Sequence, residues 1–249
     1  MKKLFLAILI LSFTLLGISC KCYEHSVIPP VEIVDAGESI DDMLPDNDND
    51  LIIVPPDIST LIEYNVTVIY PNTGSCGGTV VESIPEATLV LTAAHCVLNK
   101  EAKTMKYGFI EFNDNGRYRV EVQAINRQQD LALLVVTDPI ETKEAASLSL
   151  INPQTGDHVW VIGNGAGIED LMSDGIIGKA DVMHIYFKKQ HCMIIDASAA
   201  FGNSGGGVFN DDNELIGVLS TNGPQHPVDG EWNYAIHLDE IKKFLRKYL

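Results

Sequence analysis

The sequence has few basic residues, and they do not gather into a stripe. Its 249 residues include 17 Lys and Arg against 34 Asp and Glu, which gives a formal net charge of −17. A protein that binds the phosphate backbone of a nucleic acid needs clustered cationic side chains. We therefore expect no nucleic-acid partner and attribute the acidity mainly to solubility.

Helical periodicity is also scarce. Only the C-terminal residues 238–249 place apolar side chains on one side of a helix, namely Leu238, Ile241, Phe244, Leu245 and Leu249. From about residue 60 the chain consists of short β-branched runs separated by turns, such as "EYNVTVIY", "ATLVLTA", "LALLVV" and "HVWVIG". Many short strands with one terminal helix predict an all-β fold, an antiparallel barrel or sandwich.

The first nineteen residues have the layout of a signal peptide. Two lysines precede an apolar run that is short for spanning a membrane, so we expect export and exclude residues 1–19 from the fold. The run ends in "LLGISC", where Cys20 resembles the lipid-accepting cysteine of bacterial lipoproteins. Gly17 stands where those signals usually have leucine, so a lipid anchor at Cys20 and a plain secreted form both stay open.

Residues 20–58 differ in composition from the rest of the chain. They contain ten acidic residues and one lysine, a net charge of −9, together with five prolines. This composition predicts an extended, solvated tether. Asp46, Asp48, Asp50 and Asp57 have the spacing of a calcium loop, but Leu51 stands where such a loop needs glycine, so we expect no metal.

Two strands carry residues suited to acid–base chemistry. In "LVLTAAHCV" an apolar strand ends and His95 follows on small residues that can present it at a cleft. In "RQQDLALLVV" Asp130 opens an apolar strand, which anchors its backbone and lets its carboxylate point inward. A buried carboxylate bonded to Nδ1–H of a histidine orients the ring as a general base.

The segment "FGNSGGGVFN" supplies a candidate nucleophile, Ser204. Glycines on both sides let the backbone approach a substrate closely and adopt angles that other residues resist. The N–H groups of Gly202 and Ser204 can then face one point and form an oxyanion hole. Strands bracket the segment closely, which disfavours a glycine-rich linker.

In this order and context, His95, Asp130 and Ser204 resemble the chymotrypsin-like (trypsin-like) serine proteases, and most of all the bacterial HtrA/Deg branch. The motifs that carry the resemblance are "LTAAHCV", "DLALL", "DASAAFGNSGGGVFNDDNELIGV" and "WNYAIHLDEIKKFL". The resemblance implies two six-stranded antiparallel barrels, about 60–145 and 146–237, within a protease domain at 59–249 that closes with helix 238–249. It also implies His95 as general base, Asp130 as its orienting carboxylate and Ser204 as nucleophile.

The sequence departs from the family at several places. Gly207 stands where proline is usual, and we expect no PDZ segment after the terminal helix. Asn203 precedes the serine, whereas trypsin-like zymogens have an aspartate that pairs with a freed N-terminus. Asparagine cannot form that ion pair, and no "IVGG"-like start precedes the first strand. We therefore expect an oxyanion loop that does not depend on this route of activation.

Five cysteines are present. In the trypsin-like family, cysteines at the places of Cys76 and Cys96 form a disulfide that ties a strand to the histidine turn, which suits an exported protein. Two buried thiols are the alternative. Cys192 is either buried in its strand or paired with Cys22.

The resemblance also bears on substrate preference. Ser198 lies six residues before Ser204, where trypsin has an aspartate, so cleavage after Arg or Lys is not expected. Leu219 occupies the place of a histidine in glutamate-specific relatives, and Asn222 replaces an open glycine and shortens the pocket. We expect a preference for small or medium apolar residues.

These features predict a serine endopeptidase of the cell envelope or a secreted one, which acts on proteins or peptides without a cofactor or metal. It would contact a membrane only through a lipid on Cys20. A catalytically silent binding module is the first alternative, although none of the catalytic groups is missing. A nucleotide-binding protein is a weaker one, because "VWVIGNGAG" lacks the full dinucleotide fingerprint.

Overall fold

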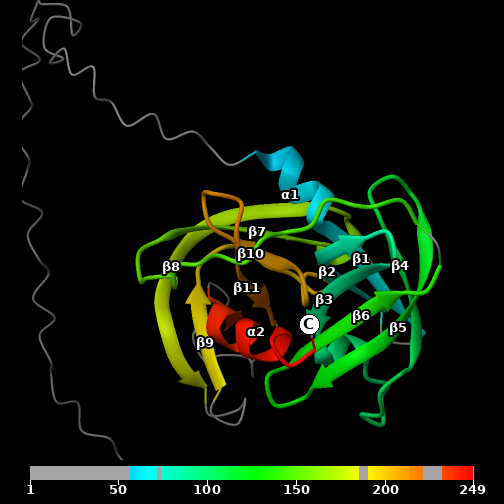
Figure 1. Cartoon of the computed structure of the whole chain (residues 1–249). Helices are drawn as coiled ribbons and strands as arrows, with labels where there is room; N and C mark the ends of the chain where they lie inside the picture. The colour runs from blue at the N-terminus through cyan, green and yellow to red at the C-terminus, as the bar shows by residue number, and fades with distance from the viewer. Residues whose placement is uncertain (1–56, 72–73, 139, 185–189, 221–231, 249) are drawn as a thin grey trace, which may run out of the picture. The chain divides into compact units, whose positions relative to one another are not determined.

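The described residues form two closed barrels, each of six antiparallel strands, followed by a short helix (Figure 1). The computed structural model describes residues 57–71, 74–138, 140–184, 190–220 and 232–248. The fold class predicted from the sequence is therefore confirmed. The predicted signal peptide, nearly all of the predicted tether, Cys20 and Cys22 lie outside the described residues.

The first barrel is closed by pairing of β1 with both β2 and β4. The order around it is β1-β2-β3-β6-β5-β4. A 3-10 turn, η2 (Ala94–Val97), follows β3 and carries His95. The strands are β1 (Asn65–Tyr70), β2 (Gly74–Ile84), β3 (Ala87–Ala93), β4 (Tyr107–Glu111), β5 (Arg117–Asn126) and β6 (Leu131–Val136).

The second barrel is closed by pairing of β10 with both β7 and β11. The order around it is β10-β11-β12-β9-β8-β7, and a 3-10 turn, η3 (Gly165–Gly167), lies between β7 and β8. The strands are β7 (His158–Gly163), β8 (Leu171–His184), β9 (Gln190–Ile195), β10 (Gly207–Phe209), β11 (Leu215–Leu219) and β12 (Asn233–His237).

Strands β3 and β6 are apolar on both faces because each face meets a different core. Val90 pairs with Leu134, and both pack inside the first barrel. Leu91 pairs with Leu133, and both pack in a second core shared with the other barrel and the terminal helix. Successive side chains of a strand point to opposite faces. Strand β3, which ends just before His95, and strand β6, which begins just after Asp130, thus lie where the barrels meet.

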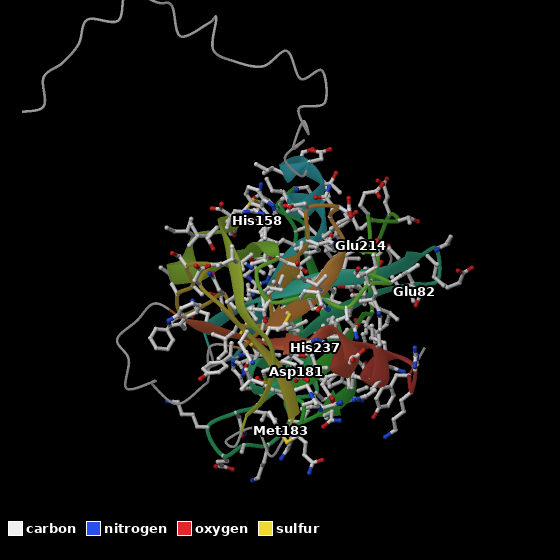
Figure 2. The ribbon with its side chains drawn as sticks, turned by 90° about the vertical axis from the view of Figure 1, so that its left-hand side faces the viewer. Glu82, His158, Asp181, Met183, Glu214 and His237 are labelled. Atoms are coloured by element: carbon white, nitrogen blue, oxygen red, sulfur yellow. A yellow bond between two sulfur atoms is a disulfide. The ribbon has the colours of Figure 1, made fainter. Side chains whose placement is uncertain are left out.

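The terminal helix α2 (Leu238–Leu245) packs on the shared core through Ile241, Phe244 and Leu245. It ends earlier than the predicted range 238–249, and Leu249 lies outside the described residues. Nδ1 of His237 accepts the N–H of Asp239 at 3.1 Å and caps the first turn. Figure 2 labels His237 near the start of this helix. Among the described residues, no helix has the length and apolar character needed to cross a membrane.

A second helix, α1 (Ile58–Tyr64), precedes β1 and corrects the expectation that only the C-terminus is helical. The strand expected to begin at Glu63 begins at Asn65 instead. The Asp57 carboxylate caps α1 by accepting the N–H of Ser59 at 3.1 Å, whereas Asp46, Asp48 and Asp50 lie outside the described residues. Seven residues are too short to show helical periodicity, and the burial of Leu61 in the shared core stabilises them.

Candidate active site

His95 is held in the turn η2, directly after β3. Ala93 and Ala94 are buried, and the N–H of Ala94 donates to the carbonyl of Asp130 at 2.9 Å. A disulfide joins Cys96 to Cys76 of β2, with the two Cα atoms 6.1 Å apart. The His95 side chain remains 24% exposed, so its ring is both anchored and accessible.

The carboxylate of Asp130 binds His95 at two places. Its Oδ2 lies 2.8 Å from Nδ1 of the ring, and its Oδ1 accepts the backbone N–H at 2.9 Å. Asp130 is 7% exposed and has φ of +52°, a left-handed conformation that aspartate tolerates better than most residues. Because a carboxylate only accepts, the ring proton belongs on Nδ1, which leaves Nε2 as the basic nitrogen.

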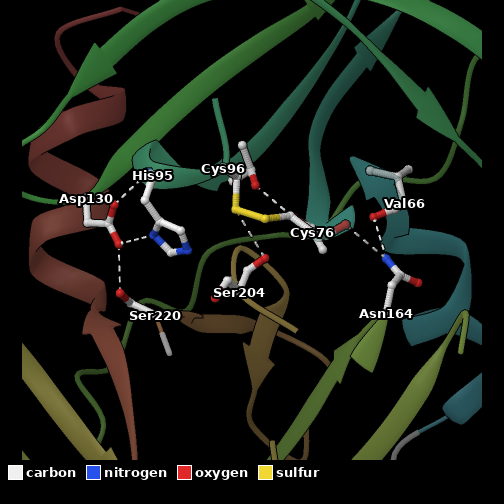
Figure 3. The surroundings of a disulfide bond; sticks show 10 residues. Val66, Cys76, His95, Cys96, Asp130, Asn164, Ser204 and Ser220 are labelled. Carbon is white, nitrogen blue, oxygen red and sulfur yellow. Dashed lines mark hydrogen bonds and ion pairs between the residues drawn. A yellow bond between two sulfur atoms is a disulfide. The ribbon is translucent and has the colours of Figure 1, made fainter. Parts of the chain in front are cut away.

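Ser220 completes the surroundings of this carboxylate, and the sequence analysis missed it. Its hydroxyl donates to Oδ2 of Asp130 at 2.7 Å, from just beyond the end of β11 (Figure 3). The sequence offers only a serine after an apolar strand, 90 residues away from Asp130. The sequence did offer one signal for Ser220: it is a polar residue at the end of an apolar strand, in the same part of the chain as Ser204.

Ser204 lies in the loop between β9 and β10 and is 5% exposed. Its carbonyl accepts the N–H of Gly77 at 2.8 Å and lies 3.6 Å from Sγ of Cys96. A disulfide sulfur has no proton to donate, so the second contact is one of packing. In the view of Figure 3 the His95 ring turns one nitrogen to Asp130 and the other toward Ser204. The disulfide therefore braces both the histidine turn and the serine loop.

The serine loop requires glycine at two positions. Gly202 has φ of +107°, and a Cβ there would lie 2.3 Å from the carbonyl oxygen of Asn164. Gly205 has φ of +86°, and a Cβ there would lie 2.3 Å from the carbonyl oxygen of Gly77. Other residues are strained in this region of φ, so the loop conformation depends on these glycines.

The glycine run "VWVIGNGAG" supports the serine loop. The N–H of Ala166 donates to the carbonyl of Phe201 at 2.7 Å. Nδ2 of Asn164 donates to the carbonyl of Val66 at 3.0 Å and so links the two barrels. The run follows β7 and leads to the antiparallel β8 rather than to a crossover helix, which contradicts the nucleotide-binding alternative.

Asn203 belongs to the serine loop and is buried, with 1% of its surface exposed. A Cβ at Gly165 would lie 2.3 Å from its Oδ1, so the amide rests directly on this glycine. Among the described residues, that oxygen has no hydrogen-bond partner. A neutral amide in such a place costs far less than a carboxylate would.

The three residues predicted to shape the specificity pocket, Ser198, Leu219 and Asn222, differ in how exposed they are or lie outside the described residues. Ser198 is exposed, and its carbonyl accepts the hydroxyl of Ser173 at 2.6 Å. Leu219 is fully buried in the core of the second barrel, and its backbone bonds the serine loop at Gly205 and Gly206. Asn222 lies outside the described residues.

One group among the described residues has metal-ligand atoms within 4.8 Å of one another, and it consists of Cys76, His95 and Cys96. Both sulfurs belong to the disulfide, so they cannot act as thiolate ligands. Cys192 is buried in β9, as one of the two alternatives predicted.

Comparison with known proteins agrees with this geometry. The model of the trypsin-like peptidase domain matches residues 73–218, which is more than half of the chain. The mitochondrial serine protease HTRA2 of Drosophila grimshawi is 28% identical over 170 residues, which is 66% of this chain and 37% of the relative. The HTRA2 of Drosophila virilis is 26% identical over 169 residues and is covered to 38%. The chain thus spans less than two fifths of the length of these relatives. From the domain match and the fold together, the chain belongs to the trypsin-like peptidase family.

Proposed function

We propose that this protein is an exported serine endopeptidase that cleaves peptide bonds through an acyl-enzyme. The observation that carries the proposal is the double attachment of His95 to Asp130, in a site whose other side is the glycine loop of Ser204. A histidine held in one tautomer beside a serine is the arrangement that nucleophilic acyl transfer needs.

The proposed reaction begins with His95. Its Nε2 takes the hydroxyl proton of Ser204 while Oγ attacks the substrate carbonyl, and the imidazolium is stabilised by Asp130. The tetrahedral intermediate collapses as the imidazolium gives this proton to the leaving amine. Water, activated by the same nitrogen, then hydrolyses the ester on Ser204 and frees the enzyme.

The N–H groups of Gly202 and Ser204 are proposed to bind the oxyanion of the tetrahedral intermediate. The left-handed conformation of Gly202 and its close approach to Asn164 support a rigid loop at this place. Preorganised N–H donors act mainly on the charge that develops in the transition state, which raises kcat rather than binding alone.

Substrate preference and export complete the proposal. Ser198 stands where an aspartate would bind Arg or Lys, and Leu219 stands where a histidine would bind glutamate. Asn222 lies outside the described residues, and from its bulk we expect a shorter pocket than glycine would leave. Digestion of a peptide library should therefore show cleavage after Val, Ala or Leu, and cleavage mainly after Arg, Lys or Glu would reject this preference. Cell fractionation of the wild type and of Cys20→Ala, with a fatty-acid label, distinguishes an anchored from a secreted form.

A second test concerns processing. Asn203 cannot pair with a freed N-terminus, so we propose that activity does not await removal of the acidic segment 20–56. Protein that retains this segment and protein that begins at Asp57, which caps α1, should have the same kcat/KM within about twofold. Inactivity of the longer form until it is cut would contradict the proposal.

The decisive experiment is labelling with a fluorophosphonate probe, which reacts with an activated serine. We expect labelling of the wild type and none of Ser204→Ala or His95→Ala. A folded wild type that is not labelled would favour the alternative, a binding module that has kept the fold of a protease without its activity.

A further inference from the structure

The turn that presents Asp130 is built from residues 126–129. Oδ1 of Asn126 accepts the N–H groups of Gln128 at 3.0 Å and Gln129 at 3.1 Å, which closes the turn. Asp130 follows directly in a left-handed conformation, with φ of +52°. Such a conformation costs a non-glycine residue free energy, so it persists only where neighbouring contacts fix it.

The side chain of Gln129 connects this turn to the terminal helix. Its Oε1 accepts a hydrogen bond from Nδ2 of Asn126, and its Nε2 donates to Oε2 of Glu240. Glu240 belongs to the first turn of α2 and lies 111 residues from Gln129 in the sequence. The residue directly before Asp130 therefore contacts the terminal helix.

Glu240 is a buried carboxylate, and each of its two oxygens accepts a hydrogen bond from a side chain. It is 6% exposed, and its other oxygen accepts a hydrogen bond from Nζ of Lys243 at 2.8 Å. Burial raises the pKa of Glu240, but the hydrogen bonds from Lys243 and Gln129 outweigh it and leave the pKa below its usual value. A carboxylate is costly to bury, so one that keeps a hydrogen bond on each oxygen restrains the partners that donate them.

We propose that Glu240 is a positioning residue for the reaction: through Gln129 it holds the turn 126–129 and so sets the orientation of Asp130 toward His95. This inference rests on the proposed function, since it concerns the efficiency of the His95–Asp130 pair. Helix α2 packs on the shared core through Ile241 and Phe244. The contact of Glu240 with Gln129 gives this helix a second role, in positioning Asp130.

The test compares Glu240→Ala, Gln129→Ala, the double variant and Glu240→Gln in the full chain. We expect each alanine variant to lower kcat by about five- to tenfold with KM unchanged within twofold, because the reacting groups are misaligned while the substrate site is intact. The double variant should lose no more than the larger single loss, since both changes break one chain of contacts. Glu240→Gln keeps an acceptor oxygen for Gln129 and should recover most of the rate.

Asp239→Asn is the matched control. It removes an acidic charge one residue away, but the Asp239 carboxylate accepts from Asn152 at 3.3 Å on the surface instead of reaching the turn. We expect its kcat to equal that of the wild type. Additive losses in the double variant, or a loss in Asp239→Asn equal to that in Gln129→Ala, would overturn the proposal. So would a wild-type kcat in Gln129→Ala, a test that stands even if Glu240→Ala fails to fold.

A spectroscopic readout separates this inference from the proposed function. The Nδ1–H proton of His95 gives its own NMR resonance when it is held by a carboxylate, whether or not the protein cleaves peptides. We expect this resonance to broaden or move in Gln129→Ala and to stay unchanged in Asp239→Asn. An unchanged resonance in Gln129→Ala overturns the positioning role, whereas an unlabelled wild type with a sensitive resonance overturns only the protease.

Discussion

Asp130 holds His95 by its ring and by its backbone at the same time. The two oxygens of one carboxylate divide the task, with Oδ1 on the N–H and Oδ2 on Nδ1. A ring tied only through Nδ1 could swing with its partner, whereas this double attachment fixes the ring relative to the chain that carries it. A change at Oδ2 therefore alters the tautomer of the ring, and a change at Oδ1 alters how the carboxylate is held relative to the backbone of His95.

Asp130→Asn should lower kcat by about 10³- to 10⁴-fold. The backbone N–H of His95 will select the amide oxygen, so the amide nitrogen faces Nδ1 and donates to it. The ring proton then moves to Nε2, which can no longer act as a base. The measurement is kcat at pH 7.5, with circular dichroism to verify folding. Asp138→Asn is the control, because the Asp138 carboxylate accepts from the Arg119 N–H away from the site, and its kcat should stay within twofold.

Ser220→Ala should lower kcat/KM by about tenfold and the free energy of unfolding by about 1–3 kcal/mol. The substitution leaves Oδ2 of the buried Asp130 with one donor fewer, so the carboxylate is held less firmly. Steady-state kinetics and urea unfolding measure the two effects. Ser83→Ala removes a hydroxyl that bonds Thr88 at 2.8 Å on the first barrel and should leave kcat/KM unchanged. Equal kinetics for both variants would exclude a role for Ser220.

The sequence predicts the fold and the principal site residues where the signal is local. His95, Asp130 and Ser204 each follow or precede an apolar strand, and strand and turn patterns extend over only a few residues. Helix α1 was missed because its stability comes from burying Leu61 in a core built by distant strands. Local pattern alone cannot reveal that kind of support.

Ser220 and Asn164 form contacts that the local sequence pattern could not predict, for the same physical reason. Their partners lie 90 and 98 residues away, so the contacts exist only once the barrels have formed. The burial of Leu219 in the core of the second barrel is likewise a product of the fold, and its part in the specificity pocket stays a prediction.

Loss of the disulfide should lower the free energy of unfolding by about 3 kcal/mol, because Cys76 and Cys96 close a loop of 20 residues. It should also lower kcat, since the bridge braces η2 and packs against the carbonyl of Ser204. The comparison is urea unfolding and kinetics of Cys76→Ala/Cys96→Ala against the wild type. Added reductant should reproduce the effect in the wild type and change nothing in the double variant. If reductant weakened both proteins equally, the bridge would not be the cause.

Stability should fall in acid because of His237. Burial lowers the pKa of this histidine, despite the opposing carboxylates of Asp239 and Asp181. The unfolded chain therefore takes up the proton first, at a pKa of about 6.5. The stability present above pH 6.5 is lost as the pH falls toward the lower pKa of the folded state. Protonation of Nδ1 would also remove the cap of α2. His237→Asn, which can still cap, should reduce this loss in urea unfolding between pH 5 and 8.

His158 provides a control of opposite sign for that measurement. Burial lowers its pKa, but the carboxylates of Asp211 and Asp174 outweigh burial and leave the pKa above its usual value. Its contribution is present below pH 6.5 and is lost as the pH rises through the folded pKa. His158→Asn should therefore weaken the protein more at pH 5 than at pH 8. The same slope in both histidine variants would contradict the assignment.

Asn203→Asp should destabilise the protein by about 2–4 kcal/mol at pH 8. The new carboxylate would be buried against Gly165, at an oxygen that has no hydrogen-bond partner among the described residues. Because burial favours the neutral acid, the folded pKa rises above the unfolded value of about 3.9, and the penalty grows as the pH rises from there. Urea unfolding at pH 5 and pH 8 measures it. Asn115→Asp, in an exposed turn with φ of +63°, adds the same charge and should cost little at either pH. A stable, fully active Asn203→Asp protein would show that this pocket accepts an anion.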